Sequence, residues 1–284
     1  MAVSARLKSS ALLVALLVAL LVAAGSLGAQ NLDSLRNSYL LPVPPTVARA
    51  VAAASRSREA PGTSAQSPTA YGADWGDGFL GAGFEGRVRY TKNLPDGAVF
   101  AGFGLGNSDD NIGFEGDITS FSTVRSGFGN HSSFSFKLHR NLPGNFAVAA
   151  GWEDAIRTKG LDGGTSIFGV VSSAYKRVTV SAGLGGGRFR TEYNIDNDIH
   201  RVNAFGSVGV RVAEPVSLIA DWAGQNLAIA ASIVPFARLP LFILPGVADL
   251  THSAGDGPRF ILGVGLGFRF AQVRNMVFPN RTAQ

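Results

Sequence analysis

The feature that most constrains this chain is a repeated alternation of apolar residues with small or polar ones. It is clearest over residues 259–270, where glycines and arginines alternate with a run of apolar side chains. The apolar members of that run are Phe260, Leu262, Val264, Leu266, Phe268 and Phe270. Successive side chains point to opposite faces only in a strand, because a helix brings residues three or four apart together. The pattern therefore predicts a strand, and it recurs over residues 201–212 and 177–184.

Nine further segments show the same alternation less regularly. They are residues 80–90, 98–105, 112–121, 132–139, 146–152, 166–175, 216–222, 227–234 and 239–247. Segments 227–234 and 239–247 are nearly apolar on both faces, so the sequence predicts strands there but defines their register less well. With the three clear cases, the sequence predicts an all-β chain.

The polar faces of these strands carry mainly glycine and serine, with occasional charged residues. In a soluble sandwich the polar face carries charge into water, whereas a crowded barrel lumen favours small side chains. The apolar faces would then contact lipid, and closure of the sheet would satisfy backbone groups that lipid cannot. We therefore predict a transmembrane antiparallel up-and-down β-barrel of about 12 strands, in the range of roughly 10–14. The alternative that stays open is a secreted soluble all-β protein that binds a partner.

The predicted connections alternate in length along the chain. Short ones fall at 106–111, 140–145, 176, 213–215 and 235–238, and longer ones at 122–131, 153–165, 185–200 and 248–258. Two connections, 91–97 and 223–226, are short where the alternation calls for long ones. Outer-membrane barrels have tight periplasmic turns and longer outer loops, so both ends of the barrel chain are expected on the periplasmic side.

The start of the chain has the features of an export signal. Arg6 and Lys8 precede an uninterrupted apolar run at 11–24, which small residues follow. That run is shorter than the ~20 residues of a membrane-spanning helix, so residues 1–28 are predicted to be a cleaved signal peptide rather than an uncleaved anchor. Residues 29–78 are rich in Pro, Ala and Ser and are predicted to be a flexible periplasmic arm or a plug. Residues 79–270 form the predicted barrel and 271–284 a C-terminal tail.

Composition excludes several classes of protein. The chain has no cysteine, which removes disulfide frameworks, zinc ribbons, iron–sulfur clusters and cysteine nucleophiles. Its 36 glycines do not recur every third residue, which excludes collagen, and its 19 phenylalanines argue against whole-chain disorder. Basic residues exceed acidic ones only slightly after residue 78, so nucleic-acid binding is not expected.

Motifs that would indicate chemistry are weak. The spacing GAGFEG at 81–86 matches a dinucleotide loop, but more strand-like sequence follows it instead of a helix. The four histidines lack metal-ligand spacing, and the acidic stretches at 109–111 and 194–198 lack the pattern of an EF-hand. Ser133 and Ser135 share a predicted face with His139, which leaves a barrel hydrolase as a third, weaker option. We predict no catalytic residue, metal or cofactor, and a protein that is not an enzyme.

Charged residues on the polar faces are the candidate site. Inside a barrel, opposite charges would pair, and an unpaired excess would select an ion or an anionic solute. The lumen-lining candidates are Glu85, Arg87, Arg89, Glu115, Asp117, Lys137, His139, Arg201, Arg211, Asp221, Arg259 and Arg269. Structural pairing inside a plugged barrel and conduction through an open one both remain possible interpretations.

The C-terminal half resembles uncharacterised outer-membrane β-barrel proteins of cyanobacterial type and, more distantly, YjbH-like barrels. The resemblance lies in AEPVSLIADW at 213–222, GQNL at 224–227, SIVPF at 232–236 and GDGPRF at 255–260, and it extends over residues 93–270. The aromatic end of the chain, Leu266, Phe268 and Phe270, resembles a barrel-assembly signal. The resemblance implies contact with outer-membrane lipid and with the barrel-assembly machinery. It also implies a small pore or scaffold linked to export or to envelope glycan or lipid.

Overall fold

The computed structural model describes residues 62–86, 95, 97–121, 129, 131–158, 165–236, 239, 241–254 and 257–269. The predicted signal peptide, the first part of the arm and the C-terminal tail lie outside these residues. Arg87, Arg89 and Phe270 also lie outside them.

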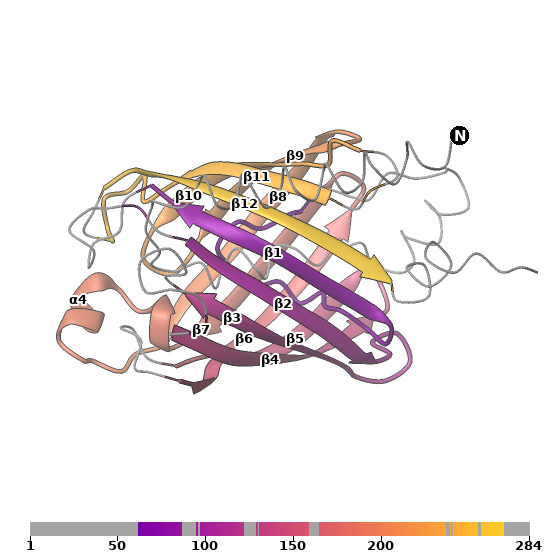
Figure 1. Ribbon diagram of the computed structural model, residues 1–284, viewed down its shortest axis with the longest axis horizontal. Coiled ribbons are helices and arrows are strands. Elements are labelled where there is room, and N and C mark those ends of the chain that lie inside the picture. Colours follow the sequence, from indigo (N-terminus) through magenta and orange to yellow (C-terminus); the bar gives the residue numbers. More distant parts are fainter. Residues whose placement is uncertain are drawn as a thin grey trace, which may run out of the picture.

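The described residues form a closed barrel of twelve antiparallel strands, in which each strand pairs with its neighbour in sequence (Figure 1). The strands are β1 (Asp77–Glu85), β2 (Gly97–Gly106), β3 (Gly113–Phe121), β4 (His131–Leu142), β5 (Phe146–Arg157), β6 (Ser166–Tyr175), β7 (Val178–Gly185), β8 (Asn203–Ala213), β9 (Val216–Trp222), β10 (Leu227–Ile233), β11 (Leu241–Ala248) and β12 (Arg259–Arg269). Pairing of β1 with β12, from Asp77 opposite Arg269 to Glu85 opposite Ile261, closes the sheet. The predicted barrel and its twelve strands are confirmed.

Large apolar side chains cover the outside of the barrel, and the inner face is mixed: glycine, serine and charged residues share it with large apolar side chains such as Phe79, Phe168 and Phe205. In β6, Ile167 and Val171 are exposed, whereas Ser166, Val170 and Ser172 are buried. The same alternation runs along β5, β7, β8 and β9. A soluble protein rarely exposes a contiguous apolar surface of more than a few hundred Å². The encircling apolar face therefore fits a lipid environment, and the soluble alternative does not fit it.

The two ends of the barrel differ. We call the end at which β1 begins and β12 ends the near end, and the opposite one the far end. Three near-end turns are tight, with residues 143–145, 176–177 and 214–215 joining their strands, while the near-end connections 107–112 and 234–240 are longer and the far-end connection 223–226 is short. The far end carries the long connection 186–202, which contains the short helices η2 (Gly187–Phe189) and α4 (Glu192–Asp196) and projects beyond the strands (Figure 1). Within the described residues, no helix is long and apolar enough to cross a membrane.

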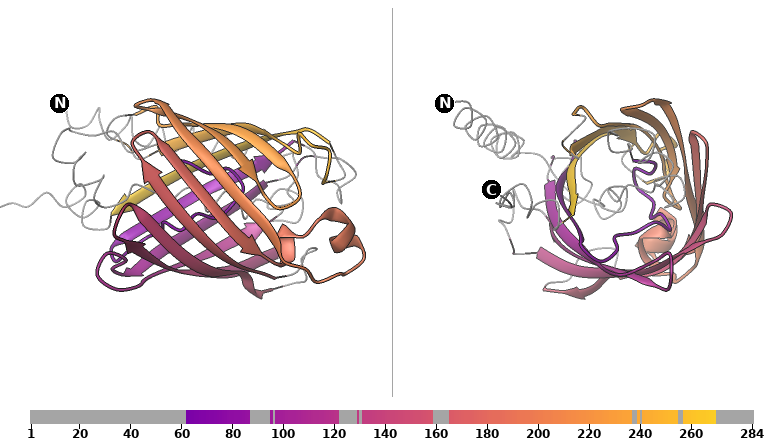
Figure 2. Two further views of the ribbon diagram at one scale, coloured as in Figure 1. Left: turned by 180° about the vertical axis from the view of Figure 1, so that it is seen from behind. Right: turned by 90° about the vertical axis from the view of Figure 1, so that its right-hand side faces the viewer.

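A segment that precedes β1 lies inside the barrel. Residues 62–74, which we call the strap, are buried except for Gly72 and Asp74, which are partly exposed. Viewed along the barrel, this part of the chain crosses the space enclosed by the strands (Figure 2). The predicted flexible arm or plug thus includes a segment that the barrel encloses.

Glycines on the inner face of the barrel make room for the strap. A Cβ atom added at Gly209 in β8 would lie 2.8 Å from Cα of Thr63, and one at Gly104 in β2 would overlap the backbone of Ala73. Within the strap, a Cβ atom at Gly72 would lie 2.6 Å from Cε1 of His139. Glycine is therefore abundant on the inner face partly because backbone approaches backbone there.

Candidate functional site: the barrel lumen

The strap follows a bent path through the lumen. Its first residue donates from the Gly62 N–H to the Ser232 hydroxyl, 2.8 Å away and near the near end of β10. Its middle contacts Asp221, next to the last residue of β9 at the far end. Its last residue, Asp74, accepts from Ser108 in the near-end connection between β2 and β3. The strap therefore rises from the near end, turns at residues 64–67 and returns.

Asp221 is the hydrogen-bond acceptor at this turn. Its Oδ2 accepts the backbone N–H groups of Ala65, Gln66 and Ser67 at 2.8, 2.8 and 3.0 Å, and the Ser64 hydroxyl at 2.7 Å. Its Oδ1 accepts the Ser67 hydroxyl. Asp221 and Ser67 have no exposed surface. Successive backbone N–H groups that converge on one anion form a nest, which stabilises the buried negative charge.

Glu115 and Lys137 hold the returning limb of the strap. They lie opposite each other on β3 and β4, with Nζ of Lys137 3.2 Å from Oε1 of Glu115. Lys137 donates to the Tyr71 carbonyl at 2.7 Å, and Glu115 accepts the Ala73 N–H at 3.0 Å. Each charge thus has a partner and a strap backbone group, as burial requires. Burial raises the pKa of the Tyr71 hydroxyl to about 12.

Asp74 ends the strap between three polar groups. Nε2 of His139 on β4 lies 3.3 Å from its Oδ1, and the Ser108 N–H and hydroxyl donate at 2.9 and 2.7 Å. Burial alone would raise the pKa of Asp74, but hydrogen bonding from His139 and Ser108 outweighs burial and lowers the pKa below its ordinary 3.8. The His139 side chain itself is fully buried.

A second element enters the lumen from the far end. Arg188 in η2 pairs with Glu153 on β5, with its Nη2 2.8 Å from Oε1, and donates from Nη1 to the Gln66 carbonyl at 3.2 Å. Its guanidinium also lies over the Phe189 ring, which stacks on Phe205 of β8 at 4.3 Å between centroids. The far-end loop and the turn of the strap therefore meet inside the barrel.

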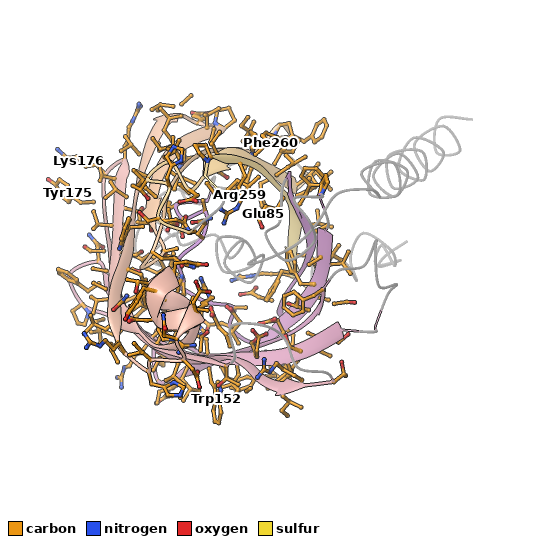
Figure 3. The ribbon with its side chains drawn as sticks, turned by 90° about the vertical axis from the view of Figure 1, so that its left-hand side faces the viewer. Glu85, Trp152, Tyr175, Lys176, Arg259 and Phe260 are labelled. Carbon is orange, nitrogen blue, oxygen red and sulfur yellow. The ribbon has the colours of Figure 1, made fainter. Side chains whose placement is uncertain are left out.

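A buried charge cluster lies beside the seam of the barrel. Arg259 on β12 pairs with Glu85 on β1, and both side chains point toward the interior (Figure 3). Nη1 of Arg259 lies 3.5 Å from Oδ2 of Asp249, which also accepts the N–H groups of Ala254 and Gly257. This cluster connects the two closing strands with the loop between β11 and β12.

The remaining predicted lumen residues have different surroundings. Asp117 on β3 is buried and accepts the Thr119 hydroxyl. Arg211 is partly exposed and donates to the Glu214 carbonyl at 2.8 Å in a near-end turn. Arg201 precedes β8 and is exposed, and Arg269 is exposed with its Nε 2.7 Å from Oδ1 of Asp77. Arg201 and Arg269 are therefore not part of the buried set.

The predicted assembly-signal residues end the closing strand. Leu266 and Phe268 are partly exposed in β12, where they pair with Leu80 and Gly78 of β1. Phe270 lies outside the described residues.

Sequence reasoning allowed a plug within residues 29–78, but it did not find which residues form the strap or its partner Arg188 on the far-end loop. Asp74, Ser64 and Ser67 belong to a polar stretch without strand periodicity, and Arg188 belongs to a long connection. The signal that could have found them is the excess of glycine and serine on the inner faces, because a lumen that encloses another segment needs small residues and hydrogen-bonding hydroxyls.

The hydrolase arrangement considered from the sequence is not assembled by the described contacts. The Ser135 hydroxyl accepts the Asp154 N–H at 2.9 Å, while His139 contacts Asp74. A serine nucleophile would need the histidine within hydrogen-bond reach. Among the residues that the structure describes, no group of three acidic or histidine side chains could hold a metal ion.

A closed antiparallel barrel with an apolar exterior and buried charged groups in its interior defines the class: the chain is an outer-membrane β-barrel protein. No family model and no curated protein matches it. Among solved structures it is similar to outer membrane phospholipase A from Escherichia coli, with a TM-score of 0.43 and 9% identity over 71% of this chain and 98% of that one. It is also similar to a Salmonella typhi outer membrane phospholipase dimer with bound calcium, with a TM-score of 0.43 and 9% identity over 69% and 91% of the two chains.

These neighbours contradict the prediction that the chain is not an enzyme. Both similar barrels are phospholipases, which are enzymes. At this sequence identity the similarity is one of fold, and it assigns no activity, metal or oligomeric state to this chain. The comparisons give no link to YjbH-like barrels, so that part of the resemblance stays a prediction.

Proposed function

We propose that this protein is an outer-membrane scaffold whose lumen is closed in the resting state by its own strap. The observation that carries the proposal is the hydrogen bonding of the strap backbone to side chains of the barrel wall. Six strap N–H groups, those of residues 62, 65, 66, 67, 70 and 73, donate to wall serines or carboxylates. Buried backbone groups need partners, and here the wall supplies them.

The charges of the lumen support the same role. An open, selective pore would present unpaired charge of one sign to the passing solute. The described contacts instead pair Glu115 with Lys137 and Glu153 with Arg188, and both pairs also bind the strap backbone. We propose that the predicted lumen-lining residues serve mainly to seat the strap and to brace the seam.

The pore and export roles predicted from the sequence require the strap to leave the lumen. They would make this barrel a gated channel, in which the strap is the gate. Export of the chain across the inner membrane, assembly of the barrel through its C-terminal strand and a periplasmic near end belong to the same proposal. They are supported by the apolar run at 11–24 and by the tight near-end turns.

Planar-bilayer recording of the refolded full chain tests the closed state. We expect wild-type protein to insert and stay closed, and a variant without residues 62–74 to conduct, because removal of the strap leaves a water-accessible lumen lined by charges. Heat-modifiable migration on a denaturing gel would show that both proteins are folded. Steady open-pore conductance of the wild type would contradict the proposal.

A further inference from the structure

We propose that the turn of the strap at Ser64–Ser67 is a receptor for a carboxylate, and that the side chain of Asp221 is its resident ligand. The inference rests on the proposed closure of the lumen by the strap. It goes further because it assigns to the strap a binding site of defined chemistry.

The donors of this site come from four consecutive residues. Three backbone N–H groups converge on one carboxylate at 2.8 to 3.0 Å, and the hydroxyls of Ser64 and Ser67 lie 2.7 and 2.5 Å from its oxygens. The two hydroxyls also have the carbonyls of Ser67 and Trp222 within hydrogen-bond distance, so the backbone N–H groups are the fixed donors of the site. Four of the five donors meet at the single atom Oδ2 of Asp221. Only donors converge there, so the turn matches an acceptor that carries negative charge.

The site and its ligand belong to different parts of the chain. The donors lie in the strap, and the acceptor lies on β9, about 155 residues further along. The β-sheet is complete without the contact, because β9 pairs with β8 and β10 through its backbone. The carboxylate can therefore be removed from the wall without removing any donor from the turn.

The size of the site selects the ligand. An Asp221→Ala substitution removes a carboxylate group and keeps Cβ, so formate, the smallest carboxylate, is the ion nearest in size to the missing group. Formate has two oxygens in the same geometry as the missing group, whereas chloride has the charge without that shape. Acetate carries one additional methyl group, which the space does not provide for.

Hydrogen exchange of the full chain in lipid vesicles tests the proposal. We expect Asp221→Ala to accelerate exchange in the peptide that contains residues 65–67 by about tenfold or more, because these amides lose their acceptor. Formate should restore slow exchange in that variant, acetate should do so less well, and chloride at equal ionic strength should have no effect.

Two further variants serve as controls. Asp221→Asn fills the same space and keeps one acceptor oxygen without the charge, so exchange should be slower than in Asp221→Ala, and formate should not slow it further. Asp249→Ala removes another fully buried carboxylate that accepts two backbone N–H groups, but from its own loop, so the strap should exchange as in wild type. Unchanged exchange in Asp221→Ala, or equal rescue by chloride and formate, would overturn the proposal.

The readout is separate from conductance. If wild-type protein conducts but formate rescues the variant, closure of the lumen fails and the carboxylate receptor stands. Should Asp221→Ala not fold, the yield of heat-modifiable protein after refolding replaces exchange as the measurement. Rescue of that yield by formate and not by chloride would support the receptor, and equal yields would overturn it.

Discussion

At the scale of single residues, the interior of this barrel is governed by the cost of burying charge. Glu115, Lys137, Asp221 and Arg188 are all at least nine-tenths buried, and each has an opposite charge or several hydrogen-bond donors or acceptors. Loss of one partner leaves the other as an uncompensated buried charge, which costs more than the pair contributes.

Lys137→Met should therefore destabilise the protein strongly. It leaves the Glu115 carboxylate buried without its cation, at a cost of about 3–5 kcal/mol in the free energy of unfolding. The double variant Lys137→Met with Glu115→Gln should recover part of that loss, because the amide is neutral and still offers an oxygen to the Ala73 N–H. Urea unfolding from vesicles measures both, and equal stability of the single and double variants would contradict this account.

Asp74 should make the near end of the strap sensitive to acid. Its pKa is lowered in the folded protein, so its contacts contribute stability fully above its ordinary 3.8, and that contribution is lost as pH falls through the lower folded value. The neighbouring groups that also bear on it are His139 and Asp77, and Asp77 lies against Arg269.

Fluorescence of Trp75, the exposed neighbour of Asp74, reports this transition when Trp152 and Trp222 are replaced by Phe in both proteins compared. We expect the emission of wild-type protein to change below pH 3.8. Asp74→Asn should resemble the acid form at every pH and should show no such change. An identical acid transition in both proteins would assign it to another group, such as Asp77.

At the scale of elements, strands and strap differ in how far sequence predicts them. Strand periodicity is a local pattern. Every strand has one face toward lipid and the other toward the lumen, which imposes the pattern, so all twelve described strands were predictable. The strap has no such period, because its backbone bonds to side chains about 40 to 170 residues away. The buried positions of Asp221 and Lys137 followed from the alternation, but their partners in the strap did not.

Gly104 tests whether the inner face is shaped for the strap. Gly104→Val would push its side chain into the backbone at Ala73, so the strap should become accessible to protease while the barrel stays folded. Gly169→Val is the matched control, because a Cβ atom there meets nothing within 4 Å and the position is exposed on β6. Equal strap cleavage in both variants would show that the fit at Gly104 is unimportant.

At the scale of the whole molecule, the barrel exposes many large apolar side chains that a soluble protein would bury. Leu218, half exposed near the middle of β9, represents the surface that we assign to lipid. Leu218→Arg should cost about 2–4 kcal/mol in the membrane, whereas Leu218→Phe should be tolerated. Unfolding from vesicles measures the difference, and tolerance of the arginine would contradict burial in lipid.

Continuity between the strap and β1 constrains the order of events during assembly. Only two residues, Trp75 and Gly76, separate the strap from the strand that completes the cylinder with β12. A closed barrel can be entered only through its two open ends. A strap that was still outside when the barrel closed would have to enter through the near end, and six backbone amides and several charged groups would have to lose their hydration as it did so. The simplest route is for Asp221 and Glu115 to capture the strap while the seam between β1 and β12 is still open. The lumen would then form and be filled in one kinetic event, and β1 would pair with β12 when the strap is already bound inside the barrel.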